Sequence, residues 1–400
     1  MLRLLAGEAA RRFGGRAAVV TGDTSLSFAE LDRLSDQVAA GLAHRGVRIG
    51  DLVVLALPDG PEFVICYVAA AKIGAVTAGI GTARMELLGT LDPALIVTVP
   101  GVLPPLAGLD VVTLPVERDG RGARAYDPAL LTGLRRNEPP PPPFPPDPAR
   151  PVVITFTSGR TGPPKAVVFG NRQLEAIRAH GAGTHWGTQQ GAGEARLVPY
   201  PLGRLGFATR LPVFLQTGRT CHVVPEWSPE AALRVIRRHG IGVLQGSPYQ
   251  LARILEGGED LPGLALVLCG GAPAAPELIR ALRSKYGVPV CNRYTCTEAG
   301  LGMGTRPDDP PETAEVSVGR PRGGVDLSIR DREGRPLPCE DPGEVLLRSD
   351  AVMSGYLGRS PDRAVFARDG FIRTGDRGYI DHTGRLHLVG HVARVPQSPA

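Results

Sequence analysis

Residues 152–169 read VVITFTSGRTGPPKAVVF. The β-branched run 152–156 predicts a buried strand, and residues 166–169 predict a second strand. Between them lie glycines that tolerate positive φ, several hydroxyl groups and one lysine. Backbone amides, hydroxyls and a lysine on a tight turn suit a polyphosphate group. The alternative is an ordinary Gly/Pro surface hairpin, and the spacing is not the GxxxxGK[ST] of a P-loop.

The composition is typical of a soluble globular chain. It has 400 residues, of which 42% are hydrophobic and 21% are charged. The formal net charge is +5, but the basic residues are scattered without Lys/Arg runs or interleaved aromatics, which argues against nucleic acid as a partner. Only three residues are lysines, namely Lys72, Lys165 and Lys285. The lysine between the two predicted strands is therefore conspicuous.

Cysteine usage and hydropathy predict a cytoplasmic protein. None of the six cysteines forms a CxxC pair, as expected for free thiols in a reducing compartment. The charged start of the chain does not read as a signal peptide. The most apolar stretch, 63–83, is interrupted by Lys72 and three glycines. It predicts a buried helix and strand, and no membrane span is expected.

The N-terminal part alternates predicted strands and helices. Strands are expected at 17–21, 52–57, 75–80 and 94–99, and Ser27 with Glu30 predicts a capping box before a helix. This alternation predicts a doubly wound, parallel α/β sheet. The proline-rich segment 137–151 predicts an extended connector, with a proline-docking ligand for a partner as the alternative.

The quoted stretch resembles the phosphate-binding signature of the AMP-forming adenylating enzymes. This superfamily includes acyl- and aryl-CoA synthetases, peptide-synthetase adenylation domains and firefly luciferases. The usual pattern is TSG[ST]TGxPKG, from which Arg160 and Ala166 depart. The resemblance implies that Lys165 is catalytic and that ATP is bound by Thr157, Ser158, Gly159, Thr161, Gly162 and Lys165.

Two further motifs of the resemblance imply contacts to the nucleoside. Residues 270–273 read GGAP, which is similar to the turn that lies against adenine in the family. The residues implied in this contact are Gly270, Gly271, Ala272 and Pro273. The sequence TGDRG contains Asp376, which matches the aspartate that holds both ribose hydroxyls. A carboxylate that accepts two neighbouring O–H donors suits this role.

Residues 294–298 read YTCTE and resemble the YGxTE motif. The resemblance implies that Tyr294 stacks on adenine, that Thr297 reaches the α-phosphate and that Glu298 ligates Mg²⁺. Thr297 and Glu298 are thereby candidate catalytic residues, and Glu298 is the candidate metal ligand. A carboxylate oxygen is a ligand that magnesium prefers. Thr295 stands where the family has glycine.

The acyl pocket is implied by a segment similar to the family's PLFHxxG, in which the histidine position falls on Arg204. The candidate substrate-pocket residues are Arg204, Phe207, Ser247 and Leu301. An arginine facing the pocket repels the ammonium of an amino acid and pairs with a second carboxylate. The alternative is that Arg204 points to solvent. Fatty, aryl and short acids all stay open.

The resemblance covers most of residues 15–390. It implies one large AMP-binding domain over 1–390, with a small β-rich subdomain near 315–390. Residues 391–400 are expected to be a hinge stub, in which His391 and Arg394 replace the usual arginine and aspartate. The family's small C-terminal domain and its catalytic lysine are expected to be absent.

The resemblance therefore implies an ATP-dependent, AMP-forming carboxylic acid ligase, similar to acyl-CoA synthetases and other acid–thiol ligases. It would form an acyl adenylate with MgATP and pass the acyl group to CoA, to the phosphopantetheine of a carrier protein or to an amine. The alternative is a non-catalytic nucleotide- or acyl-binding homologue, or a subunit that needs a separate small domain in trans.

Overall fold

The computed structural model describes residues 1–81, 84–104, 108–116, 124–159, 162–184, 186–187, 194–358 and 365–391. The chain forms two compact units. Unit 1 contains Met1–Gly242 and Met353–Gly358, and unit 2 contains Val243–Val352 and Arg359–Ala400. Both units combine helices with sheets, so the predicted α/β class is confirmed.

The main sheet of unit 1 has seven strands in the order β19-β9-β8-β4-β3-β5-β6. Their bounds are β3 (Leu52–Ala56), β4 (Val76–Gly79), β5 (Leu95–Thr98), β6 (Val111–Thr113), β8 (Pro151–Phe156), β9 (Ala166–Gly170) and β19 (Gly355–Tyr356). Neighbours from β8 to β6 are parallel, whereas β9 pairs antiparallel with both β8 and β19. The strands predicted at 152–156 and 166–169 are confirmed as β8 and β9.

Apolar side chains cover this sheet, which explains its near-continuous hydrophobic strands. All five residues of β3 are buried. Helix α3 (Pro61–Lys72) packs on β3 and β4, and the short helix η1 (Met85–Thr90) contributes Leu87 to the cluster around Val54 and Ile96. The predicted helix and strand within 63–83 are thus α3 and β4. None of the described helices combines the length and the apolarity that a bilayer crossing requires.

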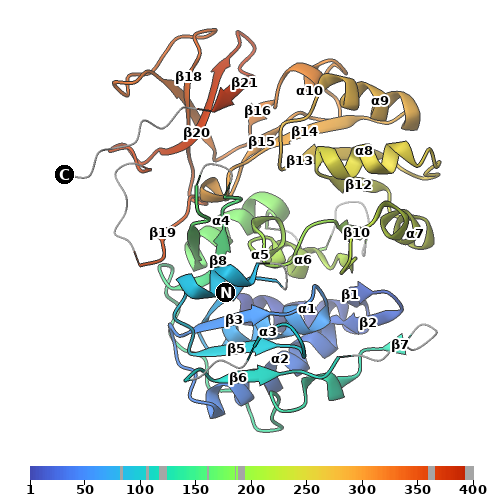
Figure 1. The fold of residues 1–400 in the computed structure, drawn as a ribbon, viewed down its shortest axis with the longest axis vertical. Coiled ribbons are helices and arrows are strands. Elements are labelled where there is room, and N and C mark those ends of the chain that lie inside the picture. Colours follow the sequence, from blue (N-terminus) through green and yellow to red (C-terminus); the bar gives the residue numbers. More distant parts are fainter. Residues whose placement is uncertain are drawn as a thin grey trace. The chain divides into compact units, whose positions relative to one another are not determined.

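A second, five-stranded sheet and the remaining helices complete unit 1. The sheet has the order β10-β11-β1-β2-β7, with β1 (Ala17–Thr21), β2 (Thr24–Ser27), β7 (Arg124–Ala125), β10 (Ala195–Val198) and β11 (Thr220–Val223). The helices are α1 (Leu2–Phe13), α2 (Phe28–His44), η2 (Pro128–Leu131), α4 (Asn171–Ala182), α5 (Leu205–Ala208), α6 (Leu211–Thr217) and α7 (Pro229–His239). Helices α2 and α3 pack against each other beside β3, at the blue end of the chain in Figure 1.

Local signals set where two of these segments begin. Ser27 Oγ accepts a hydrogen bond from Glu30 N at 3.2 Å, and Glu30 Oε2 accepts one from Ser27 N at 2.8 Å, so the predicted capping box starts α2. The proline-rich connector forms no helix or strand before β8. Arg3 Nη1 donates to Pro141 O at 2.8 Å, which fastens the connector to α1.

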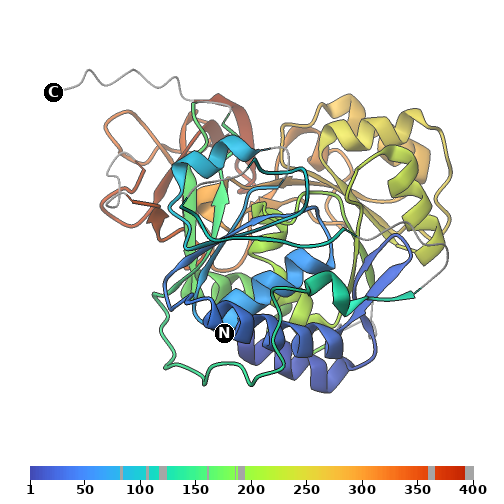
Figure 2. The ribbon, with the colours of Figure 1, turned by 60° about the horizontal axis from the view of Figure 1, so that its bottom comes forward.

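Unit 2 contains a mixed sheet and an antiparallel sheet. The mixed sheet has the order β12 (Val243–Gly246), β13 (Leu266–Gly270), β14 (Val290–Tyr294), β15 (Met303–Gly304) and β16 (Arg320–Pro321). The antiparallel sheet has the order β17 (Asp326–Arg330), β18 (Gly343–Arg348), β20 (Ile372–Ile380) and β21 (Leu386–His391), which confirms the β-rich region near 315–390. The short helices are η3 (Thr297–Ala299) and α10 (Thr313–Val316). Helices α8 (Pro248–Glu256) and α9 (Pro276–Tyr286) pack together beside β12–β14, yellow to orange in Figures 1 and 2.

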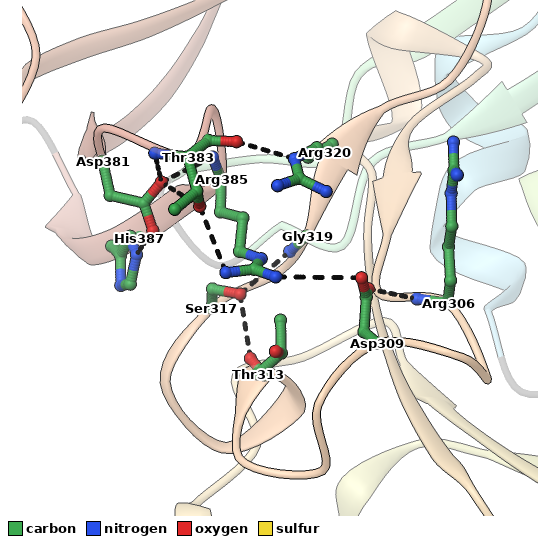
Figure 3. Close-up of polar contacts among 10 residues, drawn as sticks. All are labelled: Arg306, Asp309, Thr313, Ser317, Gly319, Arg320, Asp381, Thr383, Arg385 and His387. Atoms are coloured by element: carbon green, nitrogen blue, oxygen red, sulfur yellow. Dashed lines mark hydrogen bonds and ion pairs between the residues drawn. The ribbon is translucent and has the colours of Figure 1, made fainter.

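A polar network in unit 2 holds the turn between β20 and β21 (Figure 3). Asp381 Oδ1 accepts hydrogen bonds from Thr383 N at 2.8 Å and from Arg385 N at 2.9 Å. The Arg385 guanidinium points to Asp309 at 3.9 Å, and Arg320 Nε donates to Thr383 O at 2.7 Å. The turn is therefore anchored to the segment that precedes β17, and this fixes the strand that carries the predicted ribose-binding aspartate.

Lys72 is 1% exposed at the end of α3 and joins that helix to α2. Its Nζ lies 2.7 Å from Asp32 Oδ1 and 2.8 Å from Asp36 Oδ1. We expect Lys72→Met to lower the free energy of unfolding by about 1–3 kcal/mol, because two partly buried carboxylates lose their cation. Urea denaturation measures this change.

Lys285 provides the matched control, because it pairs with Asp260 at 2.7 Å on the surface. Exposed ion pairs contribute little to stability, so Lys285→Met should leave the free energy of unfolding nearly unchanged. Equal effects of the two substitutions would contradict a structural role for the buried lysine.

Candidate functional site

The hairpin of β8 and β9 closes the predicted phosphate loop by two hydrogen bonds. Thr157 N donates to Lys165 O at 3.1 Å, and Lys165 N donates to Thr157 Oγ1 at 2.9 Å. Gly159 and Gly162 have φ values of +77° and +145°, a region that favours glycine. Ser158 is exposed in the same loop. Thr161, like its neighbour Arg160, lies outside the described residues.

The side chain of Lys165 lies over an aromatic ring that the sequence did not point to. Its Nζ is 4.8 Å from the centroid of the Tyr356 ring. Tyr356 belongs to β19, which pairs with β9 directly after the loop. Tyr356 lies in a segment that resembles the family, but the sequence did not indicate a contact with Lys165. This contact depends on the pairing of β19 with β9, which lie far apart in the chain.

In unit 2, the predicted adenine turn follows β13. Gly271 has a φ of +84°, and a Cβ placed there would meet nothing within 4 Å. Ala272 and Pro273 are exposed beside it. Gly270 is different, since a Cβ there would lie 2.9 Å from Arg293 Cβ on the neighbouring β14. Gly270 therefore permits the close packing of β13 against β14, whereas Gly271 leaves open space beside its backbone.

Each carboxylate oxygen of Asp376, the candidate ribose-binding residue, has a polar side chain beside it. The Tyr294 hydroxyl donates to Oδ2 at 2.6 Å. His391 Nδ1 lies 2.6 Å from Oδ1, because Asp376 and His391 are cross-strand partners in β20 and β21. Burial raises the pKa of the Tyr294 phenol well above its usual range, and the Cys296 thiol and the Asp376 carboxylate act in the same direction. The phenol therefore stays protonated and acts as a donor.

Thr297 and Glu298 lie in η3, directly after β14, and both side chains are half-buried. Burial, followed by the neighbouring Glu298, raises the pKa of the Cys296 thiol well above its usual range. Among the described residues, no group of three or more His, Cys, Asp and Glu side chains is placed to hold a metal ion. A single carboxylate such as Glu298 fits the way in which Mg²⁺ is usually bound, by one or two carboxylates together with substrate phosphates.

The predicted substrate-pocket residues are divided between the two units. Phe207 is 0% exposed and stacks on Phe214 with ring centroids 5.6 Å apart. In unit 2, Leu301 is buried, and Ser247 caps α8 by accepting a hydrogen bond from Gln250 N at 3.3 Å. These three residues have evident structural roles, and their contact with an acyl group remains a prediction.

Arg204 is half-buried at the start of α5, and within the described part of the chain no acidic side chain pairs with it. Burial and the nearby positive charge of Arg84 lower its pKa, although a guanidinium stays charged at neutral pH. Arg84 is mostly buried, and its Nε lies 3.8 Å from the exposed carboxylate of Glu86. This corner of unit 1 therefore carries an excess of positive charge.

Asp59 supports the segment that precedes Arg204. Its Oδ1 accepts a hydrogen bond from Leu202 N at 2.8 Å. The next residue, Gly203, touches Gly79 at the end of β4, since a Cβ on Gly203 would lie 2.4 Å from Gly79 O. Burial raises the pKa of Asp59 to about 6, against the lowering effect of the Leu202 hydrogen bond.

The sequence of this chain is similar to one known family and to known ligases over most of its length. The family model described as AMP-binding enzyme matches residues 7–357. The salicyl-AMP ligase/salicyl-S-ArCP synthetase of Mycobacterium tuberculosis is 30% identical, with 97% of this chain and 72% of that protein covered. The sulfoacetate–CoA ligase of Cupriavidus necator is 29% identical, with 93% and 74% covered.

The fold is shared with solved structures. The N-terminal domain of FACL13 from M. tuberculosis superposes with a TM-score of 0.82 at 24% identity, and the match covers 98% of this chain and 99% of that one. The o-succinylbenzoate CoA synthetase of Bacillus subtilis, in complex with ATP and magnesium, has a TM-score of 0.79 at 23% identity, with 97% and 79% covered. The predicted adenylating-enzyme fold is therefore confirmed.

The pKa of Asp59 predicts a pH dependence of stability. Between its ordinary pKa near 4 and about 6, the folded protein keeps a proton that the unfolded chain loses. Stability should therefore fall as pH rises through this window, by roughly 2–3 kcal/mol in total. Asp59→Asn retains an oxygen for Leu202 N and should remove this loss, as measured by urea denaturation at about pH 4 and about pH 7.5. The same loss in both proteins would contradict the assignment.

Proposed function

This chain belongs to the AMP-binding enzyme family of ATP-dependent, AMP-forming ligases, and we propose that it activates a carboxylic acid with a second anionic group. The acid carboxylate attacks the α-phosphorus of ATP, so a carboxylate–phosphorus bond forms and pyrophosphate leaves. A thiol then attacks the acyl carbon, and AMP leaves as the acyl thioester forms. CoA or the phosphopantetheine of a carrier protein is the proposed thiol.

The observation that carries the proposal is the β8–β9 hairpin. It holds Lys165 at the end of a loop whose glycines adopt left-handed backbone, and the loop is closed by the two Thr157–Lys165 hydrogen bonds. Both groups that react are anions, so a fixed cation is the main help that a protein can offer. Lys165 is the cation that we assign to the phosphates, with the amides and hydroxyls of the loop around it.

The residues of unit 2 receive the complementary roles. The bare backbone at Gly271 is proposed to face adenine, next to Tyr294. Asp376 is proposed to accept the ribose hydroxyls, and the hydrogen bond from the Tyr294 hydroxyl to Oδ2 at 2.6 Å would orient its carboxylate for this role. Thr297 is proposed to donate to the α-phosphate. Glu298 is proposed to hold magnesium, which would neutralise phosphate charge when bound.

The positive charge of Arg204 is the basis for the proposed class of acid substrate. Two partly buried guanidiniums, Arg204 and Arg84, have one exposed carboxylate near them in the described structure, so an anionic group on the substrate would offset their charge. The name of the sulfoacetate–CoA ligase from C. necator supports this idea, because sulfoacetate carries a sulfonate besides its carboxylate. An amino acid is a poor candidate, since its ammonium would be repelled.

The transfer of the acyl group to a thiol and the location of the protein in the cell are also proposals. We propose that residues 1–390 are the large domain of a family in which a small domain assists thiol transfer, and that such a domain acts in trans when it is supplied separately. The match to the N-terminal domain of FACL13 over 99% of its length supports this division. The six free cysteines support a cytoplasmic location.

ATP–pyrophosphate exchange over a panel of dicarboxylic and sulfocarboxylic acids tests adenylation. We expect exchange with at least one acid, and Lys165→Ala should reduce it by roughly 10²- to 10³-fold because an aimed cation is lost. Lys285→Ala, which alters a surface lysine, should leave the exchange rate unchanged. The assay is run with the chain alone and with an isolated small domain of a relative. No exchange in either arm would favour the alternative of a nucleotide-binding homologue without catalysis.

The anion preference has its own test. With a diacid that supports exchange, Arg204→Ala should raise KM by about 10- to 100-fold, because a charge-assisted hydrogen bond is lost. The KM of the corresponding half-ester should change little. Arg210→Ala, on the same segment, is the matched control. An equal rise for diacid and half-ester, or a rise in the KM for ATP alone, would contradict the assignment of Arg204 to the acid.

A further inference from the structure

Tyr356 provides a ring on which the ammonium of Lys165 rests. The distance from Lys165 Nζ to the ring centroid is 4.8 Å, which is within the range of a cation–π interaction. Tyr356 is 7% exposed and Lys165 is half-buried, so water screens the pair only partly. A cation–π contact strengthens when both groups are desolvated.

The backbone around Tyr356 explains how the ring reaches the loop. In β19, Tyr356 is the partner of Val167 and Gly355 is the partner of Val168, so the ring stands two residues from Lys165 in register. Leu357 N donates to Ala166 O at 2.9 Å, and Ser354 N donates to Val168 O at 2.9 Å. These bonds extend the pairing on both sides of β19, which fixes the ring relative to the lysine.

The Tyr356 ring attracts the ammonium of Lys165 without neutralising its positive charge. Lysine has a long, flexible stem that loses rotamer freedom when the ammonium is held in one position. A ring that restricts the stem beforehand reduces the entropy lost when a phosphate is bound.

We propose that Tyr356 is a positioning residue that holds the ammonium of Lys165 ready for the phosphates of ATP. This inference rests on the proposed role of Lys165 and adds a residue from a distant strand to that role. The aromatic face is the part of Tyr356 that matters. Phenylalanine should therefore replace it, and leucine should not.

The contact itself is measured without enzymatic activity. The chain has three lysines, so lysine-selective ¹³C labelling gives three sets of side-chain NMR signals. Ring currents should shift the ε-methylene signal of Lys165 upfield. We expect Tyr356→Leu to abolish that shift and Tyr356→Phe to preserve it, with Lys72 and Lys285 unchanged in both. A Lys165 signal without an upfield shift, or one that Tyr356→Leu does not move, would overturn the proposal even if the protein adenylates its acid.

ATP binding provides the functional measurement. Tyr356→Leu should raise the Kd for ATP by about 2- to 30-fold, and Tyr356→Phe by less than about twofold. In a Lys165→Ala background, Tyr356→Leu should have no further effect, because the ring acts through the lysine. Leu357→Ala is the matched control for a disturbed strand and should bind ATP as the wild type does. Additive effects of Tyr356→Leu and Lys165→Ala would overturn the proposal. Failure of the wild type to bind ATP would instead count against the proposed function, while the NMR measurement still tests the contact.

Discussion

The two hydrogen bonds between Thr157 and Lys165 are the constraint on which the proposed phosphate site of unit 1 depends. They close the phosphate loop at the point where β8 ends and β9 begins, so the lysine leaves the loop from a fixed backbone. The loop itself needs residues that tolerate left-handed backbone, which Gly159 and Gly162 supply. The position of β19 beyond β9 then adds Tyr356 to the same corner of the sheet. A single hairpin thus sets the backbone of the loop and the surroundings of its cation.

In unit 2, strand pairing sets the surroundings of the Asp376 carboxylate. Asp376 and His391 face each other across β20 and β21, and the Tyr294 hydroxyl approaches the same carboxylate from the end of β14. The turn between β20 and β21 is held by the Asp381 network, so the pairing register is well defined. Side chains on two different sheets therefore orient the Asp376 carboxylate ahead of substrate binding. Preorganised acceptors of this kind lose little free energy to reorganisation on binding.

Much of this architecture was predictable because its signals are local. The apolar runs predicted β3, β8 and β9, and Ser27 with Glu30 predicted the start of α2. What escaped prediction depends on contacts between distant segments. Tyr356 gained its place through pairing with β9, and Asp59 gained its raised pKa through burial near Leu202.

The most direct test of adenylation follows an oxygen atom from the acid into AMP. An acid labelled with ¹⁸O in its reacting carboxylate is incubated with ATP, magnesium and a thiol acceptor, and the products are analysed by mass spectrometry. Adenylation predicts that one ¹⁸O appears in AMP and that no ADP forms, because the carboxylate oxygen attacks the α-phosphorus and stays with AMP when the acyl group leaves. Release of ADP, or formation of acyl product with AMP that carries no label, would contradict adenylation as the reaction of this chain.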